Sequence, residues 1–104
     1  VIICDKDIIV AVSGLPKKEY LGQNITSELE RIIENRKTVL NVSADKLVSI
    51  KFDDSTYRSQ VISPILAAGD IYGAIILLSK EKVLTDIELK VAVSASNYLG
   101  KQLT

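Results

Sequence analysis

Few residues of this chain could take part in covalent or acid–base chemistry. Histidine is absent, which removes the commonest general base and a frequent metal ligand. Cys4 is the only cysteine, and it lies in the apolar stretch VIIC, where we expect a buried and inert thiol. Without a disulfide partner, this cysteine fits a reducing, cytoplasmic setting. A cysteine or serine nucleophile would need an activating base other than histidine.

The carboxylates do not form a recognisable reactive group either. Asp5 and Asp7 flank a predicted turn, which explains their presence without any catalytic role. Other paired acids fall in a polar loop (Asp53, Asp54) and in the first turn of a helix (Asp86, Glu88). No set of ligands has metal-site spacing, and no glycine pattern matches a phosphate-binding loop. We therefore predict a protein that is not an enzyme, with no cofactor and no metal.

Composition limits the classes that remain. The chain has 104 residues, of which 47% are apolar and 25% charged, which suits one globular domain. Its 13 basic and 13 acidic residues cancel, so the chain itself offers no basic surface for nucleic acid. No apolar run is long enough to span a bilayer, so no membrane partner is expected. Since the chain lacks Met and opens with VIICD, we expect a piece of a longer protein.

Hydrophobic periodicity and capping signals predict the order β-β-α-β-β-β-α. Alternation and turn residues indicate strands, whereas the capping-box pairs Ser27/Glu30 and Thr85/Glu88 indicate helix starts. The predicted strands are Val1–Cys4, Ile8–Ser13, Leu47–Phe52, Tyr57–Ala67 and Ile71–Ser79, and the helices are about Glu28–Lys37 and Asp86 to Leu103, with a short helical turn at Lys17–Leu21. This order favours an α+β fold, with one antiparallel sheet of about five strands and helices packed on it.

The hairpin SPILAAGDIYGAIILLSK is apolar at consecutive positions along both strands. A strand with one solvated face would alternate, so this hairpin is predicted to be central and covered on both faces. Gly73 would weaken a strand unless something must approach it closely. Pro64 is unusual in a central strand and predicts a bulge or a strand start at Ser63–Pro64.

The last helix is apolar over a wider arc than one sheet contact requires. Ile87, Val91, Ala95 and Tyr98 form one stripe, while Ala92, Leu99 and Leu103 form a second. One stripe should pack on the sheet, which leaves the other for a further helix, from an N-terminal segment or a second subunit. We assign Ala92, Leu99 and Leu103 to this dimer or helix-packing face.

Four segments together give the chain a family resemblance. VIICDKDIIVAVSG, KKEYLGQNIT, SPILAAGDIYGAIILLSK and ELKVAVSASNYLGKQL resemble the C-terminal GAF-like (PAS-like) domains of the stage V sporulation protein T family of transcription regulators. The resemblance extends over residues 1–104 and implies a single sensor domain. It also implies that DNA is bound only through an N-terminal swapped-hairpin domain absent from this chain, and that the full-length regulator forms dimers and tetramers.

The resemblance implies a small effector but does not identify it. In GAF-like domains the pocket lies beside the middle of the chain, which gives Ser49, Lys51, Tyr57 and Arg58 as the predicted ligand-binding residues. The alternative is a structural dimerisation module that binds no ligand. A redox enzyme of the GAF fold is disfavoured, because Cys4 has no resolving partner.

Overall fold

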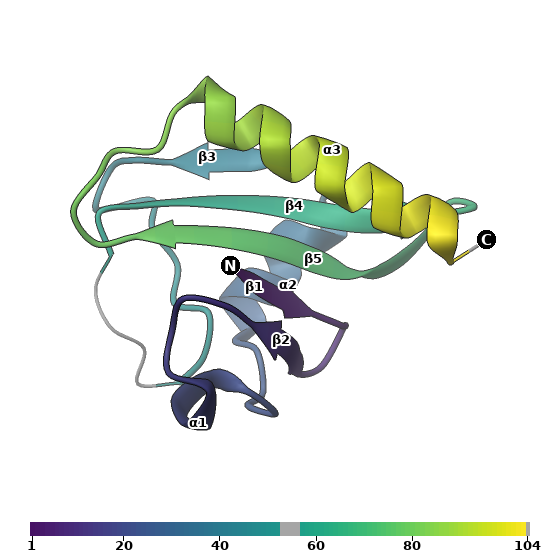
Figure 1. Cartoon of the computed structure of the whole chain (residues 1–104), viewed down its shortest axis with the longest axis horizontal. Helices are drawn as coiled ribbons and strands as arrows, with labels where there is room; N and C mark the ends of the chain where they lie inside the picture. The colour runs from purple at the N-terminus through teal and green to yellow at the C-terminus, as the bar shows by residue number, and fades with distance from the viewer. Residues whose placement is uncertain (53–56, 104) are drawn as a thin grey trace.

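The chain folds as a five-stranded antiparallel sheet with the strand order β2-β1-β5-β4-β3 (Figure 1). The computed structural model describes residues 1–52 and 57–103. In these ranges lie β1 (Ile2–Cys4), β2 (Ile9–Val12), α1 (Lys17–Tyr20), α2 (Ser27–Glu34), β3 (Val39–Asn41), β4 (Ser59–Ala67), β5 (Asp70–Ser79) and α3 (Asp86–Gln102). The predicted α+β class with helices on one antiparallel sheet is confirmed, whereas its GAF-like character stays a prediction.

β5 occupies the centre of the sheet and is shielded on both faces. Ile76 pairs with Ile2 on β1 and with Ile62 on β4, and all three side chains are fully buried in the core that Leu29 and Ile33 of α2 complete. The adjacent Ile75 points to the opposite face, on the side of α3, and is also buried. The expectation of a central hairpin covered on both sides is therefore confirmed.

A two-residue turn joins β4 to β5. Ala68 and Gly69 have φ values of 53° and 85°, and this pair of left-handed residues matches the twist of an antiparallel hairpin. Pro64 pairs with Ala74 inside the strand, and the irregularity falls between Ile65 and Leu66. The prediction of a bulge or strand start at Ser63–Pro64 was therefore wrong, since the irregularity lies two residues further along the strand. The β3 ladder ends at Ile62, so at Pro64 the strand has no neighbour on that side that needs an amide donor.

Two glycines allow backbones to approach closely. A Cβ on Gly73 would lie 1.9 Å from the carbonyl oxygen of Cys4, so this glycine accommodates β1 of the same chain. A Cβ on Gly100 would lie 2.1 Å from the carbonyl oxygen of Leu66, where α3 crosses β4. Ala92 and Ser96 precede Gly100 at four-residue intervals and are also buried, so a row of small residues seats α3 on the sheet.

The prediction of a strand at Leu47–Phe52 was wrong. Side chains, and not a neighbouring strand, make hydrogen bonds to backbone groups of this segment. The Gln60 side chain, fully buried, accepts from the Val48 amide at 2.9 Å and donates to the Val48 carbonyl at 3.0 Å. Lys51 makes one isolated bridge with Ile25. The fifth strand is instead β3, which begins soon after Arg36 (φ 62°) ends the turn that follows α2.

The start of α3 was predicted more accurately than the start of α2. The capping box of Thr85 and Glu88 is present at the start of α3, as predicted. α2 is capped one residue earlier than predicted, because the Thr26 side chain accepts a hydrogen bond from the Leu29 amide at 3.1 Å. α2 also ends at Glu34, and the segment up to Lys37 assigned to it lies outside the helix.

Replacing Gly100 with alanine tests the close helix–sheet contact. Alanine favours a helix over glycine by about 1 kcal/mol, but overpacking costs about 1–3 kcal/mol. Because the new methyl group would meet backbone atoms of Leu66, we expect Gly100→Ala to lower the free energy of unfolding, measured by urea denaturation. Ser94→Ala, an exposed site on the same helix, is the control and should be neutral or slightly stabilising. Stabilisation by Gly100→Ala would contradict this packing.

Candidate functional site

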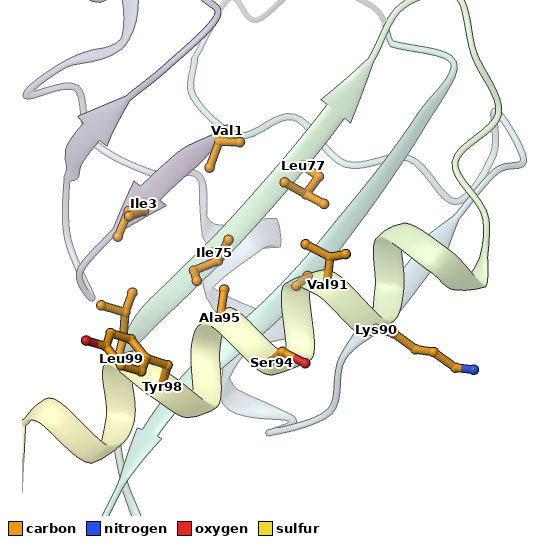
Figure 2. A pocket seen from close by; sticks show the side chains of 11 residues that line it. Val1, Ile3, Ile75, Leu77, Lys90, Val91, Ser94, Ala95, Tyr98 and Leu99 are labelled. Atoms are coloured by element: carbon orange, nitrogen blue, oxygen red, sulfur yellow. The ribbon is translucent and has the colours of Figure 1, made fainter.

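An apolar groove of about 740 Å³ runs between α3 and the β1–β5 part of the sheet. Its walls come from three segments that are distant in sequence (Figure 2). Ile75 and Leu77 of β5 form the floor, with Ile3 and the adjoining Val1 on one side and α3 on the other. The groove exists because α3 contacts β4 more extensively than β5, so its cover of the sheet is incomplete.

α3 presents a stripe of large apolar side chains beside this groove. Ile87 is 69% exposed, Val91 57% and Tyr98 63%, values that belong to surface residues although the side chains are apolar. The spacing from Ile87 through Val91 and Ser94 to Tyr98 alternates four and three residues. This is the spacing by which one helix packs along another. The groove and the stripe form one continuous surface, which we call the α3 face.

The three predicted helix-packing residues differ in their exposure and do not form one surface. Ala92 is 1% exposed and faces this chain's own sheet, so it is not available to a second chain. Leu99 is half-buried in the groove wall, and Leu103 is exposed near the end of the chain. Small residues are needed where α3 touches β4, which explains why the stripe containing Ala92 turns inward. The α3 face uses the other apolar stripe.

The α3 face lacks reactive groups. Among its lining residues Lys90 has the only charged side chain, and in Figure 2 this side chain extends away from the groove. Elsewhere in the part of the chain that the structure describes, no group of three metal-ligating side chains occurs. No described helix is long and apolar enough to cross a membrane. The mainly apolar side chains of the α3 face are suited to burial against another apolar surface.

Tyr20, which was not among the predicted ligand-binding residues, lies beside two that were, Lys51 and Tyr57. The hydroxyl groups of Tyr20 and Tyr57, both buried, are hydrogen-bonded to each other. The Lys51 ammonium group lies 5.1 Å from the Tyr20 ring centroid, and that of Lys80 lies 5.7 Å from the Tyr57 ring centroid. No local signal in the sequence links Tyr20 to Tyr57, because the two lie 37 residues apart.

Ser49 and Arg58 are each held by a backbone hydrogen bond to another segment. The Ser49 residue is exposed, and its carbonyl accepts a hydrogen bond from the Thr26 hydroxyl at 2.6 Å. Arg58 is exposed, and its amide donates to the carbonyl of Ser79 at 2.8 Å. The four-residue ligand site therefore stays a prediction. Asp53 and Asp54, assigned to a loop, lie outside the described residues.

Comparison with known proteins gives one consistent result. A family model described as "Stage V sporulation protein T C-terminal, transcription factor" matches residues 1–104. Stage V sporulation protein T of Bacillus subtilis (strain 168) is 36% identical over 103 residues, which cover 99% of this chain and 58% of the relative. The chain thus spans less than two thirds of the length of that relative.

The environment of Cys4 predicts an unreactive thiol. The residue is buried in β1, and loss of solvation raises the pKa of its thiol to about 11. At pH 8 the folded chain should hold almost no thiolate, whereas an unfolded cysteine, with a pKa near 8.5, should hold a substantial fraction. We expect slow alkylation by iodoacetamide at pH 8 and rapid alkylation in urea, followed by mass spectrometry. Equally rapid alkylation without urea would show that Cys4 is accessible and ionised.

Proposed function

Because the chain belongs to the Stage V sporulation protein T C-terminal family of transcription factors, we propose that it is the regulatory and assembly domain of a sporulation transcription regulator. DNA recognition would then belong to another part of the regulator, since this chain has no net positive charge. Its contribution would be to bring copies of the regulator together and to transmit an effector signal to them.

The observation that carries this proposal is the α3 face. Three large apolar side chains of one helix are more than half exposed and adjoin an apolar groove. Exposed apolar surface of this kind marks interaction sites in soluble proteins, because its burial is favourable by about 25 cal/mol per Å². A signalling domain without reactive groups can act through such a surface.

We assign the α3 face to a second copy of this chain. The small residues Ser94 and Ala95 lie in the middle of the stripe, and Val91 and Tyr98 lie one turn to either side. Two such helices related by a two-fold axis at Ser94 can approach closely there, with each large side chain beside the partner helix. Regulators that read palindromic DNA sites are dimers of this symmetry.

One observation supports the alternative of an assembly module without a ligand. The sheet face beneath α2 is filled, since Ile2, Leu29, Ile50, Ile62 and Ile76 are all fully buried there. An effector that bound on this face would have to displace closely packed side chains. An effector of the regulator is therefore better sought at the periphery of the sheet.

Tyr98→Glu tests assembly through the α3 face. A charge at this position would have to lose its hydration when two copies meet, so we expect dimerisation to weaken at least tenfold. Sedimentation velocity over a range of concentrations should show a dimer for the unchanged chain and a monomer for the variant.

Tyr72→Glu is the matched control. It makes the same substitution at an exposed tyrosine of β5 that does not line the groove, so the dimer should persist. A monomeric unchanged chain at all concentrations, or equal weakening by both variants, would contradict the assignment.

A further inference from the structure

A second cleft, of about 210 Å³, shares no lining residue with the groove beside α3. It is bounded by three segments, namely the β1–β2 turn at Lys6, α2 with the residues that follow it, and the start of β5. Its floor is apolar and consists of Ile25, Ile33 and Ile71. At about 30 Å³ for a water molecule in the liquid, this volume equals roughly seven waters, enough for a small metabolite.

The rim of the cleft carries charges of both signs. Lys6 and Arg36 are cationic, while Glu30, Glu34 and Asp70 are anionic. Within residues 1–52 and 57–103, none of these five side chains forms an ion pair. Charges of both signs can therefore meet a ligand, although Arg36 also donates to a backbone carbonyl, and the isoleucines line the same cleft.

Arg36 is held in place by an unusual backbone. It follows α2 at a position where glycine is the usual residue, and its φ of 62° is costly for a residue with a side chain. Its amide donates to the carbonyl of Ile33 at 3.0 Å, and its Nη1 atom donates to the carbonyl of Gly69. Arginine has five N–H donors in a planar fork, so donors remain for a carboxylate while the group stays fixed beside the β4–β5 turn.

We propose that this cleft binds an aliphatic α-amino acid. The carboxylate would meet Arg36 and Lys6, the ammonium group would meet the acidic residues, and the side chain would cover the isoleucine floor. The rim has two cationic and three anionic groups, which disfavours a dianion, while its two cations disfavour a polyamine. A zwitterion satisfies both signs at once. The inference rests on the proposed regulatory function, for which it supplies the class of effector.

The position of the cleft relative to α3 suits an effector. Arg36 contacts the Ala68–Gly69 turn between β4 and β5. This turn begins two residues after Leu66, whose carbonyl lies against Gly100 of α3. A bound amino acid that tightened the contact between α2 and this turn would therefore act one contact away from the helix of the α3 face.

Titration of the ¹⁵N-labelled chain with L-leucine, followed by NMR, tests the proposal. We expect saturable shifts of the amides of Lys6, Glu34, Asp70 and Ile71. 3-Methylbutylamine, which lacks the carboxylate, and 4-methylpentanoate, which lacks the ammonium group, should each bind at least about tenfold more weakly, since each loses a charge-assisted contact. Absence of saturable shifts, equal binding of all three compounds, or shifts confined to α3 would overturn the proposal.

Two variants separate binding from folding. Glu34→Gln changes an exposed side chain and should weaken L-leucine binding about tenfold, with an unchanged melting temperature. Lys37→Gln, just outside the cleft, should leave binding unchanged. Equal affinities for both variants would refute a role for the rim charges. The sedimentation test of Tyr98→Glu contains no leucine, so a failure of leucine binding and a failure of assembly are separate results.

Discussion

β5 has to be buried from both sides, and the positions of α2 and α3 follow from this requirement. A strand in the middle of a five-stranded sheet must be apolar on both faces if helices cover both, and Ala74–Leu77 meets that requirement. Ile76 packs in the core under α2. Ile75 lies on the other face and would be exposed to solvent if α3 did not cover it. The close fit of α3 then follows from its row of small residues, which brings the helix backbone near the carbonyl of Leu66.

Incomplete cover by α3 connects the fold to the function. Since α3 is placed mainly over β4, part of β5 and β1 stays beneath an open groove, and the outer stripe of the helix stays in solvent. The packing that stabilises the chain thus leaves one apolar surface unsatisfied. A second copy on that surface, as proposed above, would link the stability of the domain to assembly of the regulator, and assembly would give a route to regulate DNA binding.

The sequence predicted the parts of the fold that local signals determine. The hairpin turn, the Thr85–Glu88 cap and the double-sided burial of β4 and β5 all follow from neighbouring residues. The strand at Leu47–Phe52 failed because alternation alone does not reveal that a distant side chain, Gln60, will take the backbone hydrogen bonds of Val48. For such a segment, tertiary hydrogen bonding outweighs the local pattern.

The candidate sites were less predictable because they depend on packing. Helical periodicity found two apolar stripes on α3, and the stripe with Ala92 was assigned to the outer face, whereas Ala92 is buried against the sheet. The small residues Ala92, Ser96 and Gly100 were a usable signal for the inner face. Tyr20 and Tyr57 are 37 residues apart, and their contact has no signature in sequence. The charged cleft likewise combines three separate segments, so it could be found only after they were placed together.

Assembly through the α3 face can be tested by methyl NMR of the unchanged chain over a range of concentrations. If the α3 face meets a second copy, the methyl resonances of Val91, Ile75 and Leu77 should shift with concentration, while those of Ile62 and Ile76 on the opposite face should not. Concentration-dependent shifts on the α2 side with none in the groove, or no shifts at all up to millimolar concentration, would contradict it.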